Sequence, residues 1–189
     1  MKFEKFPFKL EKQFRLKNWD YSSSGFYFVT ICTKDRLKIL WNSKSNPVGT
    51  DLCVRSPNRH LPLSDFGNSC YRIWSDIPNK FKNVILDDFI IMPDHIHGII
   101  FIKNDYQERT QRSVPTKFGN IGLLGQIIRW FKTISTNEYI NGVKKYNWPK
   151  FNKQIWQNRF HDRIIRSEKE FYAKKQYIKD NPIHRSDSI

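Results

Sequence analysis

The segment Asp88–Ile102, DFIIMPDHIHGIIFI, constrains the fold of this chain more than any other. Two apolar runs rich in Ile and Phe flank a short polar centre, Pro93–His97, and residues of these types favour extended structure over helix. Pro93 has no amide hydrogen to donate, and Pro followed by Asp favours a turn. The segment therefore predicts two paired strands with a turn between them, next to the histidines.

His95 and His97 are two residues apart beside this turn. Successive side chains of a strand point to opposite faces, so both imidazoles should project from one face and Ile96 from the other. Two neutral imidazoles a few ångströms apart can chelate one divalent ion. The alternative is a pair of exposed strand histidines without a function, but the flanking apolar runs favour a site held on rigid elements.

The composition predicts a single basic domain that binds a polyanion. At 189 residues the chain is long enough for one domain with a substantial core, and 15% aromatic residues can supply that core. The net charge of +15 favours nucleic acid as the partner. An acidic membrane surface is the alternative, but no long basic amphipathic helix stands out in the sequence.

Cysteine usage and hydropathy indicate a cytoplasmic protein with no membrane association. The three cysteines are odd in number, lack the spacing of metal ligands and are expected to be reduced and mostly buried: Cys32, Cys53 and Cys70. No apolar run approaches the length of a membrane span, and the first residues lack the apolar segment of a secretion signal.

The predicted elements follow the order strand, helix, strand, strand, helix, strand, helix. We expect strands at Gly25–Lys34, Val84–Met92, Gly98–Lys103 and Gln154–Arg166, and helices from Ser64 to Pro78, over Ile121–Ile140 and from Ser167 to Pro182. Ser64 and Ser167 are the expected N-caps of the first and last helices, and Glu170 would complete a capping box with Ser167. This order predicts an α+β fold, with a ferredoxin-like antiparallel sheet and helices packed on one face.

A single catalytic domain is expected over residues 25–183, after a basic N-terminal arm at 1–24 and before a short tail at 184–189. Polar stretches predict loop insertions near 42–63 and 104–120. Surface loops tolerate insertions, so the elements on either side can still pack as one unit.

The last predicted helix carries a second group of candidate residues. Tyr177 and Asn181 are four residues apart and share a helix face. A phenol has a pKa of about 10, so Tyr177 becomes a nucleophile toward phosphorus only when a base or a cation helps to remove its proton. A divalent ion at the histidines could polarise the phosphate, and the Asn181 amide oxygen could complete a site suited to Mg²⁺ or Mn²⁺.

Each of these residues also has a structural interpretation. Tyr177 could pack on the sheet with its hydroxyl at the edge, and Asn181, which precedes a proline, could simply end the helix. Tyr172, five residues before Tyr177 and on a different face, is a competing nucleophile.

Five segments together resemble a known family: YFVTICTKDR, FIIMPDHIHGIIF, GQIIRWFK, IWQNRFHDRIIRSEKEF and YIKDNP. In this order, over residues 15–183, the chain resembles the single-tyrosine HUH transposases, and most closely the branch of REP-associated tyrosine transposases. The resemblance implies a ferredoxin-like fold, usually a homodimer, that binds hairpins in single-stranded DNA and cleaves and rejoins strands near them. It also implies that His95 and His97 are the metal-binding pair, Tyr177 the nucleophile and Asn181 the third ligand.

Basic residues that alternate with aromatic ones predict a DNA-binding surface. Seven are candidates for binding phosphates: Arg129, Lys132, Arg159, Arg163, Arg166, Lys174 and Lys175. Trp156 or Phe160 could stack on unpaired bases. The alternative is that both aromatic residues belong to the core and most of the lysines are merely solvated.

The sequence thus predicts a metal-dependent DNA strand transferase that acts on single-stranded hairpin DNA through a covalent 5′-phosphotyrosine at Tyr177. Three alternatives stay open. The first is an HUH nickase of replication or mobilisation type, which uses the same chemistry. The second is a non-catalytic protein that binds DNA hairpins or RNA, and the third is a metal-dependent hydrolase that uses water and leaves no adduct.

Overall fold

The computed structural model describes residues 21, 23–42, 63–103 and 122–181. Its centre is a four-stranded antiparallel sheet with the strand order β2-β3-β1-β4. The strands are β1 (Gly25–Cys32), β2 (Val84–Ile91), β3 (His95–Ile102) and β4 (His161–Ile165). This order confirms the predicted α+β class and the ferredoxin-like sheet.

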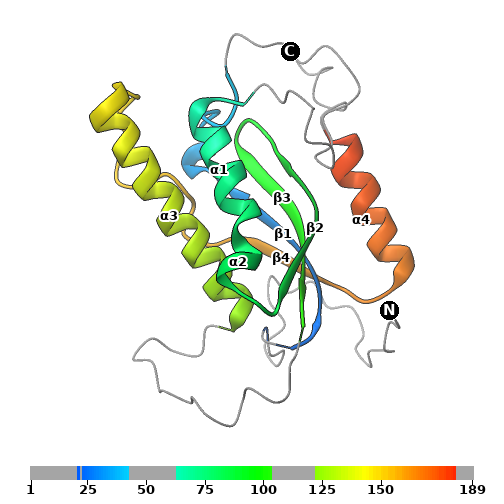
Figure 1. Cartoon of the computed structure of the whole chain (residues 1–189). Helices are drawn as coiled ribbons and strands as arrows, with labels where there is room; N and C mark the ends of the chain where they lie inside the picture. The colour runs from blue at the N-terminus through cyan, green and yellow to red at the C-terminus, as the bar shows by residue number, and fades with distance from the viewer. Residues whose placement is uncertain (1–20, 22, 43–62, 104–121, 182–189) are drawn as a thin grey trace, which may run out of the picture.

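Helices cover both faces of this sheet (Figure 1). A 3-10 helix η1 (Lys34–Arg36) follows β1, and the α-helices are α1 (Asp65–Ser75), α2 (Ile77–Lys80), α3 (Leu123–Tyr146) and α4 (Glu168–Asp180). Figure 1 shows α1, α2 and α3 on one side of the sheet and α4 on the other. The prediction that the helices share one face is therefore correct for α1–α3 and wrong for α4.

The sheet is apolar on both faces, which explains the position of α4. Tyr27 and Val29 of β1 pack in the larger apolar cluster with α1 and α3, whereas Phe28 between them packs in a smaller cluster on the opposite face. The smaller cluster contains Ile178, which is the fully buried residue of α4. Because an apolar sheet face exposed to water is unfavourable, this second face requires a cover, and α4 provides it.

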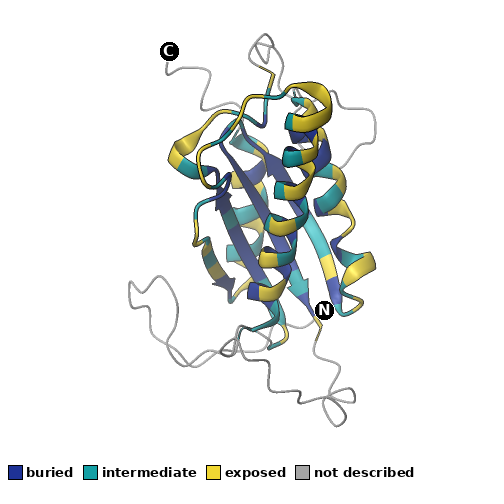
Figure 2. Cartoon of the chain, turned by 90° about the vertical axis from the view of Figure 1, so that its left-hand side faces the viewer, coloured by how far each residue is buried: buried dark blue, intermediate teal, exposed yellow. Residues whose placement is uncertain are grey.

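The larger cluster is the main core of the described part of the chain. Alternate residues of β3 reach it, including Ile96 and Ile100, and they meet Trp74 from α1 and Phe131 from α3. All four side chains are fully buried. Figure 2 shows the strands as dark, buried ribbons behind helices whose outer sides are exposed.

Helix α3 is longer than predicted at its C-terminal end. It continues past Ile140 to Tyr146, and it stops at Asn147, which adopts the left-handed conformation with φ 55° and donates its amide to the Gly142 carbonyl. The extension is stabilised by Trp148, whose ring lies where a side chain at Gly142 would be, 2.1 Å from the ideal Cβ position. Gly142 within the helical sequence of α3 therefore indicates close packing against Trp148 and not the start of a loop.

The segment before α4 contains less strand than predicted. Of Gln154–Arg166 only β4 is extended in the sheet, and Trp156 forms an isolated bridge with Thr33. Trp156 is 4% exposed and donates its indole N–H to Ser135 Oγ at 2.9 Å. Trp156 is therefore a core residue rather than a platform for unpaired bases.

Both predicted helix N-caps are confirmed. Ser64 Oγ accepts a hydrogen bond from the Gly67 amide at 3.0 Å, and Ser167 Oγ accepts one from the Glu170 amide at 3.2 Å. The Glu170 carboxylate does not return to the Ser167 amide as in a regular capping box but accepts from the Arg166 amide at 3.1 Å.

Cys32 and Cys70 are buried free thiols, as predicted, and burial raises the pKa of the Cys70 thiol. Cys53 lies outside the described residues, as do the predicted tail at 184–189 and most of the arm at 1–24 and of the insertions near 42–63 and 104–120. Among the described helices, none has the length and apolar character needed to span a membrane.

Gly98 allows the sheet to approach α1 closely, and we expect Gly98→Ala to lower the free energy of unfolding by about 2 kcal/mol. A Cβ atom at this position would lie 2.5 Å from Trp74 Cζ2 and 3.2 Å from Phe89 Cβ. Trp74 is fully buried, so its ring could move away only by displacing other core side chains. Urea denaturation measures the effect, with Gly25→Ala as the control, since a Cβ there meets only Tyr27 at 3.9 Å. Equal stability of the two variants would contradict the prediction.

Candidate active site

Strand β3 presents the two predicted metal ligands side by side. His95 and His97 are 4% and 6% exposed, and their Nε2 atoms lie 3.0 Å apart. The His97 ring also stacks on the ring of Phe28 from β1, with 5.3 Å between the centroids. The prediction that strand alternation directs both imidazoles to one face is confirmed.

A neighbouring side chain holds the other ring nitrogen of each histidine. His95 Nδ1 lies 2.6 Å from Asp94 Oδ1, and a carboxylate can only accept, so Nδ1 carries the proton and Nε2 keeps its lone pair. His97 Nδ1 lies 2.8 Å from the hydroxyl of Thr30, its partner in the register of β1 and β3. When this hydroxyl accepts, both Nε2 atoms direct lone pairs to one point, as in histidine pairs that bind a metal.

The spacing of these two nitrogens allows them to bind one ion together. His95 Nε2 and His97 Nε2 lie 3.0 Å apart, and two neutral imidazoles this close can chelate one divalent ion. The chemistry of the donor set is therefore compatible with the predicted metal.

Asn181 is the third ligand that the sequence predicts. Within the described ranges no group of three or more His, Cys, Asp or Glu residues could hold a metal ion, so a metal at the two histidines would need other kinds of ligand as well. Asn181 caps α4 one turn after Tyr177, and its Nδ2 atom is buried without a hydrogen-bond partner. A half turn of the amide would exchange Nδ2 for Oδ1, the atom that can bind a metal.

Tyr177 is the tyrosine that α4 brings to the histidines. Its hydroxyl lies 3.5 Å from His97 Nε2, and its ring meets the rings of His97 and Phe28 edge-on at 5.2 and 5.9 Å. The side chain is 46% exposed, so a phosphodiester can reach the hydroxyl from solvent. Tyr172, the competing candidate, is 59% exposed, and its ring packs on Phe171.

Lys174 places a positive charge beside Tyr177. Its ammonium lies 4.8 Å from the centroid of the Phe28 ring and 5.5 Å from that of Tyr177. Burial lowers the pKa of Lys174, the nearby Arg163 lowers it further, and Glu170 opposes the shift. A partly desolvated cation beside the phenol is suited to a phosphate or a phenolate.

The seven predicted DNA-binding residues fall into two groups. Arg163, Arg166, Lys174 and Lys175 lie on or next to α4, while Arg129, Lys132 and Arg159 lie on and beside α3. Several of these side chains bind other parts of the protein. The Lys132 ammonium donates to the carbonyls of Gln157 at 2.7 Å and Arg159 at 3.0 Å, and burial lowers its pKa to about 8. Arg163 is paired with Glu170, and Lys175 with Asp87.

Two residues contact the histidine rings but are not predicted as site residues from the sequence. The sequence pattern predicts only a turn at Asp94, although a carboxylate directly before His95 is well placed to bind its imidazole. The second carboxylate oxygen of Asp94 lies 3.5 Å from Arg36. Nothing in the sequence indicates that Thr30 contacts His97, because the two residues are 67 positions apart. Only the pairing register of β1 and β3 brings them together.

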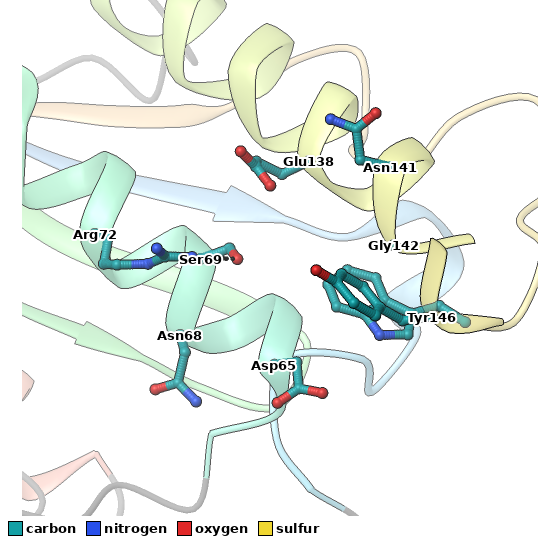
Figure 3. Close-up of a pocket in the computed structure, with 9 residues that line it drawn as sticks. Asp65, Asn68, Ser69, Arg72, Glu138, Asn141, Gly142 and Tyr146 are labelled. Carbon is teal, nitrogen blue, oxygen red and sulfur yellow. Dashed lines mark hydrogen bonds between the residues drawn. The ribbon is translucent and has the colours of Figure 1, made fainter. Parts of the chain in front are cut away.

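A cavity among the described residues lies away from these side chains. It measures about 350 Å³ and lies between α1 and α3, on the sheet face opposite to α4 (Figure 3). Its walls are polar, with Arg72 and Asn68 on α1 facing Glu138 and Asn141 on α3. The histidines and Tyr177 do not line this cavity.

Comparison with known proteins finds a related sequence and solved structures of similar fold. A protein of Haemophilus influenzae described as uncharacterised is 32% identical over 182 residues, which cover 91% of this chain and 88% of the relative. The structure of a REP-associated tyrosine transposase bound to a REP hairpin superposes with a TM-score of 0.52 at 16% identity, over 85% of this chain and 68% of that one. No family model matches the chain.

Proposed function

Because this chain belongs to the family of the Haemophilus influenzae protein and has the fold of a REP-associated tyrosine transposase, we propose that it is a metal-dependent DNA strand transferase. Its substrate is single-stranded DNA folded into a hairpin. One observation carries the proposal: His95 Nε2 and His97 Nε2 lie 3.0 Å apart, and the Tyr177 hydroxyl lies 3.5 Å from His97 Nε2. The proposed nucleophile and the two proposed metal ligands thus lie close together.

Tyr177 performs the covalent step. Its oxygen forms a bond to phosphorus, the bond from phosphorus to the 3′ oxygen breaks, and that oxygen leaves as a hydroxyl after taking up a proton. The proton of the phenol passes to solvent, to which the side chain is 46% exposed. The 5′ end remains on Tyr177 as a phosphodiester, which retains the energy of the broken bond. Attack by a 3′ hydroxyl on this diester rejoins a strand and releases Tyr177.

The neighbouring residues hold the reacting groups in place. A divalent ion held by His95, His97 and Asn181 would polarise a phosphate oxygen and stabilise the leaving 3′ oxygen. Asp94 keeps the proton of His95 on Nδ1, so that Nε2 is available. Lys174 adds a fixed positive charge beside Tyr177 for the phosphate.

The charge of the chain supports a nucleic-acid substrate. A net charge of +15 attracts the phosphate backbone over distances beyond direct contact. Exposed arginines lie on α3 and on β4, Arg129 and Arg163 among them, and their positive charges add to this attraction. We also propose that the protein works as a homodimer, as the resemblance to the HUH transposases implies.

The proposal predicts a covalent protein–DNA adduct that forms with Mn²⁺ or Mg²⁺ and not with EDTA. The substrate is a single-stranded DNA hairpin, labelled separately at its two ends, whose sequence is chosen from palindromic repeats sought in the DNA that flanks the gene. On a denaturing gel the 3′ label should move with the protein, because the 5′ phosphate of that fragment is bound to tyrosine, while the 5′ label should leave as a short free strand. Mass spectrometry of the digested adduct should find the nucleotide on the peptide that contains Tyr177.

Each alternative function gives a different result in this experiment. Tight binding without an adduct would indicate a non-catalytic hairpin-binding protein, and cut DNA without an adduct would indicate a hydrolase. A persistent adduct that a supplied 3′ hydroxyl cannot resolve would indicate a nickase. Any of these three results would overturn the proposal of strand transfer.

A further inference from the structure

Lys175 occupies an unusual position on α4. The side of this helix that faces the sheet is formed by Phe171, Lys175 and Ile178, at spacings of four and three residues. Phe171 and Ile178 pack in the smaller apolar cluster, whereas Lys175 places a charged side chain, only 15% exposed, between them. A lysine in an apolar helix face is unfavourable unless carboxylates meet its ammonium.

A β-bulge in β2 supplies two carboxylates to this lysine. The pairing of β2 with β3 shifts register between Leu86 and Phe89, so Asp87 and Asp88 together lie opposite a single residue of β3. In a regular strand these two neighbours would point to opposite faces. In the bulge both reach the same ammonium, because the additional residue turns the strand locally.

The resulting ion pair is close and shielded from water. Lys175 Nζ lies 2.6 Å from Asp87 Oδ1 and 3.3 Å from Asp88 Oδ2. The side chains of Asp87 and Asp88 are 18% and 2% exposed. Salt screens a pair of this kind much less than it screens surface charges. Lys175 was predicted to bind DNA phosphates, but its ammonium is engaged with these carboxylates.

We propose that the ion pair of Lys175 with Asp87 and Asp88 sets the position of α4 on the sheet, and thereby the distance between the Tyr177 hydroxyl and His97. The pair acts as a positioning device and does not touch the reacting atoms. Its consequence for catalysis rests on the proposed function, whereas its effect on the geometry of Tyr177 does not.

The physical reason is that apolar contacts tolerate a shift of α4 along the sheet, whereas the ion pair does not. Apolar contacts are non-directional, so Phe171 and Ile178 could be re-packed after α4 rotates or slides along the sheet. A slide of one helical turn is about 5.4 Å, and a far smaller shift would break a contact of 2.6 Å. Because Tyr177 is two residues beyond Lys175, any such shift also moves the phenol away from His97.

A second polar anchor holds the other end of the helix. Glu170 in the first turn of α4 binds the Arg163 side chain and the Arg166 amide, which fixes this end to β4. Lys175 fixes the half of α4 that carries Tyr177. The two anchors on different strands define both the position and the rotation of the helix.

The test is the environment of Tyr177 in protein without DNA. The site is labelled with 3-fluorotyrosine at position 177, and its ¹⁹F signal is compared among wild type, Lys175→Met, Lys175→Arg and Lys179→Met. We expect one shifted signal in wild type, because the phenol lies beside the rings of His97 and Phe28. In Lys175→Met the signal should move toward that of a solvated fluorotyrosine, and in Lys175→Arg it should return most of the way.

Lys179→Met is the matched control, because it removes one positive charge from an exposed position of the same helix. Its signal should equal that of wild type. If Lys175→Met leaves the signal unchanged while the circular dichroism shows an intact fold, the positioning role is wrong. If Lys175→Met fails to fold, Asp87→Asn, which keeps the shape of the residue that makes the closest contact, gives the same comparison.

Adduct formation provides the second measurement. Lys175→Met should lower the rate of adduct formation by about 100-fold, the usual effect of misplacing a reacting group by about 1 Å, with hairpin affinity close to that of Lys179→Met. A fall in affinity alone, with an unchanged rate at saturating DNA, would instead indicate that Lys175 binds phosphates and would overturn the inference. Failure of the proposed function would appear differently, as absence of the adduct in wild type, and the ¹⁹F comparison would still decide on the position of α4.

Discussion

The Tyr177→Phe protein is expected to form no covalent adduct under conditions in which the wild type does. The substitution removes one oxygen and leaves the ring, whose contacts with His97 and Phe28 hold it in place. The fold and the affinity for the hairpin should therefore be retained. Because the missing oxygen is the atom that would bond to phosphorus, we expect the rate of adduct formation to fall at least about 1,000-fold, measured on a denaturing gel with a 3′-labelled hairpin.

The matched control for this experiment is Tyr172→Phe. Tyr172 lies on the same helix and is exposed to a similar extent, 59% against 46%, but its ring packs on Phe171. This variant should react at a rate within about twofold of wild type, because a surface substitution away from the site has little effect. An adduct that persists in Tyr177→Phe and disappears in Tyr172→Phe would reverse the assignment of the nucleophile.

The second large effect is expected from the histidines. His97→Ala should abolish measurable Mn²⁺ binding and lower adduct formation by about 1,000-fold or more, since a bound metal supplies several kcal/mol to the transition state and each 1.4 kcal/mol is a factor of ten. The loss should be visible without any DNA, in titrations of Mn²⁺ followed by electron paramagnetic resonance. Hairpin binding in EDTA should stay within about threefold of wild type, because phosphate contacts supply most of that affinity.

His161→Ala is the control for the histidine experiment. His161 is an exposed residue on β4 and has no part in the pair formed by His95 and His97. It should bind Mn²⁺ and react as wild type does. Unchanged Mn²⁺ binding in His97→Ala would refute the metal site, and unchanged cleavage in the same variant would refute its role in the reaction.

Local sequence patterns were sufficient to predict the elements of this site. The alternation of a strand placed His95 and His97 on one face, and helical spacing placed Tyr177 and Asn181 on another common face. The order of the elements was also sufficient for the ferredoxin-like sheet. These predictions depend on residues close together in the chain, where the geometry of a strand or helix is known in advance.

The features that escaped prediction depend on contacts between distant segments. Thr30 meets His97 only because β1 and β3 pair in one particular register. The face covered by α4 was missed because both sides of the sheet are apolar, and the sequence alone does not say which helix covers which side. The interpretation of Lys175 as a phosphate ligand overlooked the bulge at Asp87 and Asp88, which a strand pattern cannot reveal.

The close approach of Trp74 to Gly98 links the two sides of the sheet. The sheet is a single layer, so the backbone that carries His97 on the side of α4 is the same backbone that Trp74 presses from the side of α1. The position after His97 is thus closed to any side chain by a residue that takes no part in the chemistry. A side chain at residue 98 would therefore require a smaller residue at position 74, so the geometry of the histidine site depends on packing in the hydrophobic core behind the sheet.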